Sequence, residues 1–119
     1  MNLYINDESI FTAEEAAAAG YVQEARYSDG FLTLPGTNDY AELITEIKVT
    51  SSAVDGRRKP KTFKTLEKAA AYIKEEGWAH TGVSDDGVTR LDGIYYRHGK
   101  GSFSFNGEIS RRVRNLARA

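Results

Sequence analysis

Few residues in this 119-residue chain have the types and spacing that chemistry requires. The two histidines, His80 and His98, lie 18 residues apart without an H-x-x-x-H spacing, and the chain has no cysteine to complete a zinc site. Asp85 and Asp86 precede Gly87 and lack the alternating oxygen ligands and the distal glutamate of an EF-hand calcium loop. We therefore expect turn-forming aspartates, no catalytic residue, no metal site and no cofactor.

The glycine-rich and aromatic stretch near the C-terminus matches two binding motifs poorly. Gly99 and Gly101 do not fit the G-x-x-x-x-G-K-[ST] phosphate loop, and no strand-to-helix junction follows them. Segment 100–105, KGSFSF, differs from the K-G-F-G-F core of RNA-binding strands by an extra serine, which displaces the first phenylalanine. We therefore expect a hairpin connection at the glycines, with Phe103 and Phe105 buried in the core.

Charged and aromatic side chains are the remaining candidates for a binding site. One basic cluster lies at a predicted hairpin tip and comprises Arg57, Arg58, Lys59 and Lys61. It can reach phosphates or an acidic protein surface, although a solvated turn has the same composition. A second basic group lies on a predicted C-terminal helix and comprises Arg111, Arg112 and Arg114. Tyr95 and Arg97 share one face of a predicted strand, and such side chains favour protein interfaces. We expect these residues to bind the partner.

Charge is distributed unevenly along the chain. Residues 1–56 carry ten acids and two bases, a net charge of −8, whereas residues 57–119 carry seven acids and fourteen bases, a net charge of +7. Such segregation indicates a dipolar surface that can steer charged partners.

The element that must position these groups is an amphipathic helix predicted over residues 66–76. Its apolar positions recur at i, i+3, i+4 and i+7 and are Leu66, Ala69, Ala70 and Ile73. Thr65 is the expected N-cap. Gly77 can adopt the left-handed conformation after the last turn, which brings Trp78 back onto the helix. One stripe of this helix is therefore expected to pack on a sheet.

The N-terminal half is expected to alternate strands with one short helix. Residues 1–5 form a strand, and the T-x-x-E capping box Thr12–Glu15 opens a helix over residues 13–19. The Asp29-Gly30 pair predicts a type I′ hairpin turn that follows the face of Tyr21, Ala25 and Tyr27. Residues 40–53 alternate apolar and polar side chains and predict a central strand, with Tyr40 a candidate for the surface.

The C-terminal half is expected to form short strands and a final helix. Residues 59–64 predict a strand in which Pro60 takes an edge or strand-start position, because proline cannot donate a hydrogen bond to a ladder. Turn pairs at Asp86-Gly87, Asp92-Gly93, Gly99-Lys100-Gly101 and Asn106-Gly107 predict a meander. In it the chain places Ile94, Tyr96, Phe103 and Phe105 on one face. A helix over residues 108–119 is expected to dock through Ile109, Val113 and Leu116.

These elements predict one α+β domain over residues 1–119, an antiparallel sheet of five to six strands with two to three helices packed on one face. The composition, 40% hydrophobic and 28% charged, is ordinary for a globular protein. The absence of cysteine, of an apolar run of about 18 residues and of a signal-peptide pattern predicts a cytoplasmic location.

Segment 46–105 resembles, in outline, small accessory proteins of phages and mobile elements, including some anti-CRISPR proteins. The likeness consists of a long strand ending near residue 50, a basic turn, a K-x-F-K-T-L-x-x-A helix entry at residues 61–69 and a glycine-rich meander that ends in aromatic strands. The resemblance implies a compact, non-enzymatic inhibitor that binds a host defence protein through a surface patch. It assigns no functional residue.

Two functions therefore remain open, and a small hydrolase that uses His98 with a nearby acid is kept only as a formal third. The first is a non-enzymatic binding protein, an inhibitor from a phage or mobile element, that docks on a protein or nucleoprotein partner by charge complementarity and exposed aromatic side chains. The alternative is a nucleic-acid-binding regulator that uses the basic turn and the basic C-terminal helix. The two basic groups could form one surface if the C-terminal helix packs beside the central one.

Overall fold

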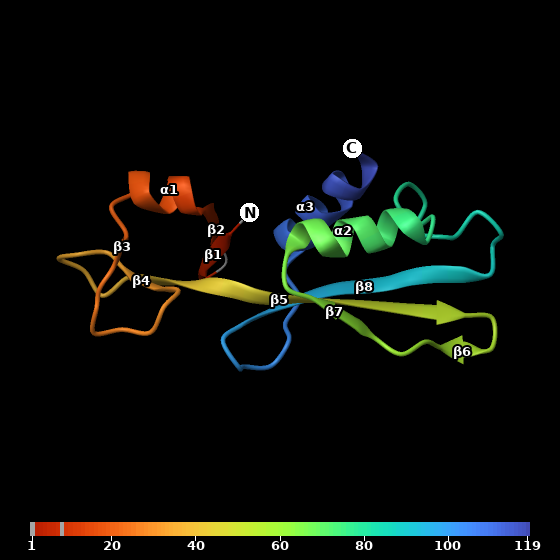
Figure 1. The fold of residues 1–119 in the computed structure, drawn as a ribbon, viewed down its shortest axis with the longest axis horizontal. Coiled ribbons are helices and arrows are strands. Elements are labelled where there is room, and N and C mark those ends of the chain that lie inside the picture. Colours follow the sequence, from red (N-terminus) through yellow and green to blue (C-terminus); the bar gives the residue numbers. More distant parts are fainter. Residues whose placement is uncertain (1, 8) are drawn as a thin grey trace.

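The computed structural model describes residues 2–7 and 9–119, and its described part is an antiparallel sheet of eight strands with three helices (Figure 1). The elements, in chain order, are β1 (Leu3–Asn6), β2 (Ser9–Thr12), α1 (Ala13–Ala18), β3 (Val22–Gln23), β4 (Phe31–Thr33), β5 (Tyr40–Ala53), β6 (Gly56–Arg57), β7 (Lys61–Phe63), α2 (Leu66–Glu75), β8 (Thr89–His98) and α3 (Gly107–Arg118). β3 and β6 have only two residues each. The predicted α+β class is confirmed.

Strand β5 organises the whole sheet. Its first half pairs with β1 and β4, in the strand order β2-β1-β5-β4-β3, and its second half pairs with β6, β7 and β8. Ile47 lies between Phe63 of β7 and Tyr96 of β8. The central position predicted for residues 40–53 is therefore confirmed. Because one 14-residue strand serves both halves, the molecule is elongated, with extents of 54 × 27 × 19 Å.

The main core lies between the sheet and helices α2 and α3 (Figure 1), and it also includes Leu3 and Ile5 of β1 and Ile10 of β2. The predicted α2 stripe is buried, and Ile73 is fully inaccessible. Helix α3 packs on α2 and β8. It docks through Ile109 and Val113 as expected, but the third docking residue is Ala117, and Leu116 stays 37% exposed. The buried stripe of α3 also includes Ser110, so its centre is rotated toward Ser110 and Ala117 and away from Leu116.

The helix ends follow their capping signals. Thr12 and Glu15 form the predicted capping box of α1, and Thr65 caps α2 by accepting from Lys68 N. After α2, Gly77 has φ 81° and the N–H of Trp78 donates to Ile73 O at 3.1 Å, which is a Schellman ending. Trp78 is thereby held in the core.

A second, smaller core stabilises the N-terminal end of the molecule. It consists of Ala16 of α1, Tyr21 and Ala41, with partly buried neighbours on the same side: Tyr4, Phe11, Leu32 and Leu34. The Tyr21 hydroxyl also accepts a hydrogen bond from Asn6 Nδ2 at 2.6 Å. We call this end of the molecule, residues 2–43, the N-terminal lobe.

Three predicted turns differ from the structure. One is Asn106-Gly107, where Asn106 is the N-cap of α3 and Gly107 is its first residue. β3 pairs with β4 as a hairpin, but residues 24–30 form a longer loop, and only Gly30 of the Asp29-Gly30 pair has positive φ. Asp92-Gly93 is not a turn at all, because β8 runs through it with a bulge. The Asp92 carboxylate accepts from the Ser52 hydroxyl across the ladder, so it serves the sheet and not a loop.

Candidate binding surfaces

The face of β5, β7 and β8 that points away from α2 and α3 carries a mixed set of basic, acidic and aromatic side chains. Along β5 the residues Ile47, Val49 and Ser51 are buried toward the helices, while the residues between them alternate to the other side. We call that side the outer face. Its members are Glu46, Lys48, Thr50, Ser52, Arg57, Arg90, Asp92, Tyr95, Arg97, Phe103 and Phe105.

Phe103 and Phe105 reach the outer face because of a single backbone pairing. Ser104 bridges Tyr96, with both N–H groups donating to the opposite carbonyl, at 2.8 and 2.9 Å. Directly opposed residues share a face, so the phenylalanines on either side of Ser104 fall with Tyr95 and not with Tyr96. Phe105 is 66% exposed. The expectation that both phenylalanines are core residues on the face of Tyr96 is therefore wrong.

Cations on the outer face lie against its aromatic rings. Lys48 Nζ is 5.3 Å from the centroid of the Tyr95 ring and 4.7 Å from that of Phe103. The Arg97 guanidinium carbon is 4.8 Å from the Phe103 centroid, and Phe105 meets Tyr95 edge-on at 6.5 Å. These are cation–π and edge-to-face geometries. They order the side chains into one continuous surface.

Two carboxylates balance part of the positive charge. Glu46 accepts from Arg97 Nε at 2.9 Å and lies 4.0 Å from Lys64 Nζ. The hydrogen bond from Arg97 lowers the pKa of Glu46 below its ordinary value of 4.5. Asp92 lies 3.3 Å from Arg90 Nε. The outer face is therefore basic overall but internally paired.

Arg57 and Tyr95 line a shallow depression on the outer face, of ≈ 330 Å³. The Tyr95 ring reaches it by lying over Gly93, and a Cβ at position 93 would sit 2.8 Å from the ring carbon Cε2 and from the hydroxyl oxygen of Tyr95. A residue with a side chain there would displace the ring, so glycine allows the tyrosine to lie along the strand. The remaining lining residues are Thr50, Ser52, Arg90 and Asp92.

The structure divides the predicted basic turn between two faces. Arg57 faces outward, whereas Arg58 turns toward the helices, 3.0 Å from Glu76 and 5.8 Å from the Trp78 ring. Lys61 follows it and lies over the Tyr72 ring, while Lys59 is exposed. Three predicted site residues therefore converge on the outer face: Arg57, Tyr95 and Arg97.

The arginines of α3 lie elsewhere. Arg111 and Arg112 pair with Glu108 of the same helix, and Arg114 donates to Ser110. Helix α2 contacts both β7 and α3, so it separates the basic turn from these arginines. The two basic groups are not brought together on one surface.

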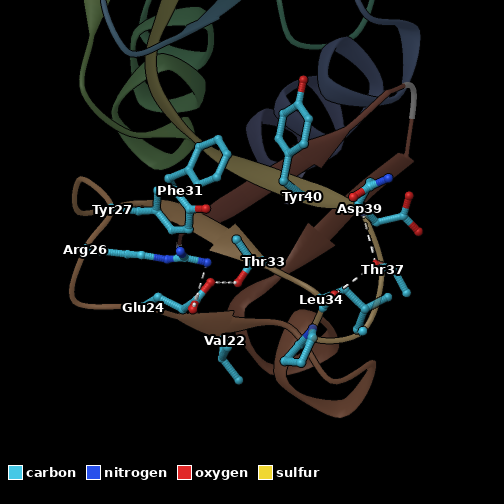
Figure 2. Close-up of a pocket in the computed structure, with 13 residues that line it drawn as sticks. Val22, Glu24, Arg26, Tyr27, Phe31, Thr33, Leu34, Thr37, Asp39 and Tyr40 are labelled. Carbon is cyan, nitrogen blue, oxygen red and sulfur yellow. Dashed lines mark hydrogen bonds and ion pairs between the residues drawn. The ribbon is translucent and has the colours of Figure 1, made fainter.

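A second concave surface lies on the N-terminal lobe, where strands β3, β4 and β5 run side by side. Val22, Thr33 and Tyr40 are cross-strand partners and form one row across it. Figure 2 shows the side chains that line this cleft of ≈ 590 Å³. Phe31 stacks on Tyr40 with centroids 5.1 Å apart and also meets Tyr27 at 5.1 Å. We call it the aromatic cleft.

The histidines and aspartates considered for metal or acid–base chemistry lie in β8 and in the turns between α2 and β8. His98 pairs through Nδ1 with Glu42 across the sheet, and His80 is exposed in the turn that follows α2. Asp86 accepts from Ser84 and from Val88 N, as a turn former does, and these bonds lower its pKa. Within residues 2–7 and 9–119 no group of three or more acids and histidines is placed to hold a metal ion.

Comparison with known proteins leaves the surfaces to be interpreted from their chemistry. No family model, curated protein or solved structure matches this chain. None of the helices in the described part is long and apolar enough to cross a membrane.

Sequence reasoning missed several members of both surfaces. Lys48 was assigned only to a strand, and Phe103 and Phe105 to the core. The sequence shows that Tyr95 and Arg97 alternate with Tyr96 along a strand. It does not show that Ser104 pairs with Tyr96, which is what brings Phe103 and Phe105 to the same face. Nothing local in the sequence indicates that three strands meet beneath the aromatic cleft.

Proposed function

We propose that this chain is a non-enzymatic binding protein that docks on a protein partner through the outer face. The observation that carries the proposal is the placement on one face of Arg57 from β6 and of Tyr95 and Arg97 from β8, beside the 66%-exposed ring of Phe105. Tyrosine, phenylalanine and arginine are the side chains in which protein interfaces are enriched.

The charge of the outer face supports a protein partner over a nucleic acid. Five cations lie on or beside it, but Arg97 and Lys64 share Glu46, and Arg90 is paired with Asp92. A phosphate backbone needs free cations, because its affinity comes largely from their neutralising successive phosphates. A protein surface with matching acidic and apolar patches can use the paired charges as they stand.

The resemblance to small phage and mobile-element proteins supports the biological role within this proposal, an inhibitor that occupies a surface of a host defence protein or nucleoprotein. That likeness is one of architecture. The outer face supplies what such a role needs, a rigid patch on a sheet whose side chains are already ordered by mutual contacts.

Capture of a partner from host-cell lysate tests the proposal when three variants are compared with the native chain. The outer-face variant carries Arg57→Glu and Tyr95→Ala, and the α3 variant carries Arg111→Glu and Arg114→Glu. The control is Lys68→Glu, at an exposed position of α2. We expect a partner that the native chain, the α3 variant and the control retain at physiological salt and that the outer-face variant loses. Association with the purified partner should slow with salt, since exposed charges act mainly on the on-rate. Retention by the outer-face variant with loss from the α3 variant would refute the assignment.

Single-stranded nucleic acid is the second candidate, favoured by one observation. Exposed aromatic rings beside cations on an open sheet are also the means by which proteins stack unpaired bases. Titration of single-stranded RNA, single-stranded DNA and duplex DNA at two salt concentrations distinguishes it. Binding of a single strand at low salt that Phe105→Ala abolishes would replace the protein-partner proposal.

A further inference from the structure

The aromatic cleft of the N-terminal lobe has a chemistry different from that of the outer face. Its walls are the rings of Tyr27, Phe31 and Tyr40, and its floor carries the Glu24 carboxylate. Tyr27 and Tyr40 remain 38% and 49% exposed, which leaves ring surface available to a ligand.

The lobe around the cleft is strongly acidic. The sequence of residues 2–43 carries eight acids and a single base, Arg26. A cleft in an acidic surface attracts cations, because the summed electric field of the acids raises the local concentration of cations. Charge complementarity therefore favours a basic occupant.

The single base of the lobe already shows how a cation fits the cleft. Arg26 places its guanidinium carbon 4.8 Å from the Tyr27 centroid and its terminal nitrogen 3.5 Å from Glu24. Glu24 in turn accepts from Thr33 Oγ1 at 2.7 Å. Figure 2 shows Arg26 reaching between the Tyr27 ring and Glu24, on the other side of Phe31 from Tyr40. The Arg26 guanidinium thus contacts an aromatic ring and a carboxylate at the same time.

The other end of the aromatic row has no such occupant. In the part of the chain that the structure describes, no cation lies over the Tyr40 ring, although Tyr40 stacks on Phe31 at 16° between planes. The Arg26 side chain itself is 71% exposed, so it can be displaced without opening the core.

We propose that the aromatic cleft binds arginine side chains of an extended, basic segment of a partner protein, and that Arg26 occupies part of this site in the free chain. Arginine is favoured over lysine because its planar, weakly hydrated guanidinium stacks on rings and pairs with a carboxylate at once. This surface is separate from the outer face and does not rest on the function proposed for it.

The test uses a capped heptapeptide with two arginines in a glycine–serine background, titrated by calorimetry. Matched peptides carry lysine or citrulline, the neutral analogue of arginine, at the same positions. We expect the arginine peptide to bind, the lysine peptide to bind several-fold more weakly and the citrulline peptide not to bind. Tyr40→Ala should weaken binding by about two- to fivefold, the size of one exposed cation–π contact, and Glu24→Gln should weaken it as well.

Arg26→Ala gives the most discriminating result. If Arg26 competes with the ligand, its removal should tighten binding of the arginine peptide, whereas a structural role for Arg26 would make the variant weaker. Tyr95→Ala, on the outer face, is the control and should leave the titration unchanged. Thermal melting of each variant shows whether the lobe stays folded. If Tyr40→Ala unfolds the lobe, Glu24→Gln still tests the cleft, because it removes a charge without changing the size of the side chain.

Several outcomes would overturn the proposal. They are equal binding of the citrulline peptide, absence of binding to any peptide, and weaker binding by Arg26→Ala. A fourth is self-association of the native chain that Tyr40→Ala abolishes, which would make a second copy the occupant. Because the outer face is left intact in every cleft variant, failure here is distinguishable from failure of the function proposed above.

Discussion

At the scale of single residues, the outer face depends on small side chains as much as on large ones. Tyr95 can lie along β8 because position 93 has no Cβ, and its hydroxyl and two ring carbons would otherwise be 2.8 to 2.9 Å from that atom. The atoms in conflict belong to the far end of a flexible side chain. The strand can therefore accept a larger residue if the ring moves.

Gly93→Ala is accordingly expected to change the surface more than the fold. The Tyr95 ring should swing away from position 93, while the free energy of unfolding changes by no more than about 1 kcal/mol, since alanine is also tolerated in a strand. Chemical shifts of the Tyr95 ring and a thermal melt measure the two effects. A large loss of stability that Tyr95→Ala does not relieve would show that backbone contacts, and not the ring, require the glycine.

The Glu46–Arg97 pair makes a second prediction at this scale. The pKa of Glu46 is lowered in the folded chain by the hydrogen bond from Arg97, so the pair stabilises the fold above pH 4.5. That contribution is lost as the pH falls from 4.5 through the lowered folded pKa. Glu46→Gln should therefore flatten the fall in melting temperature over this range. Parallel curves for the native chain and the variant would contradict a role for this pair.

At the scale of elements, the predictable parts of the fold are those whose signals are local. The α2 stripe, its Thr65 cap and its Gly77 ending all lie within 13 residues of one another and were placed correctly. The position of Pro60 immediately before β7 and the alternation of β5 also follow from local signals. Propensity and capping act over a few residues, so the sequence carries them directly.

The parts that were not predictable depend on pairing between distant segments. The face of Phe105 is decided by whether Ser104 or a neighbour opposes Tyr96, and a slip of one residue reverses it. The composition of the outer face also depends on pairing between distant segments. Tyr95 and Arg97 were found as a strand face, but the division of Arg57 from Arg58 between the two faces of the sheet needed the register of β6.

Helix α2 offers a direct test of the main core. Ile73→Ala should cost roughly 2–5 kcal/mol of unfolding free energy, because Ile73 is fully buried and its removal leaves a cavity against the sheet. Lys68→Ala, at an exposed position of the same helix, should cost less than about 0.5 kcal/mol. Urea unfolding of both variants measures the difference. Similar costs for the two would mean that α2 is not seated as described.

At the scale of the whole molecule, two cores of unequal size share one strand. The N-terminal core has three buried members, whereas the main core, which also includes Leu3, Ile5 and Ile10 of β1 and β2, has sixteen. The radius of gyration, 16.1 Å, exceeds the roughly 13.5 Å expected of a compact chain of this length. Fewer buried contacts at one end predict lower local stability there.

Hydrogen exchange should therefore be faster in β3 and β4 than in α2 and the second half of β5. Tyr21→Ala, which removes a buried ring from the N-terminal core, should accelerate exchange in the lobe and leave the α2 amides nearly unchanged. Amide exchange followed by NMR resolves both regions. Uniform acceleration along the chain would indicate a single cooperative unit.

Strand β5 carries both binding surfaces, with Tyr40 at the aromatic cleft and Ser52 on the outer face. The strand rises roughly 3.3 Å per residue, so its length fixes the distance between the two binding surfaces. A partner with two patches at that spacing would gain avidity, since the first contact sets the effective concentration for the second. Two separate partners would instead be held at a constant distance by a rigid bridge.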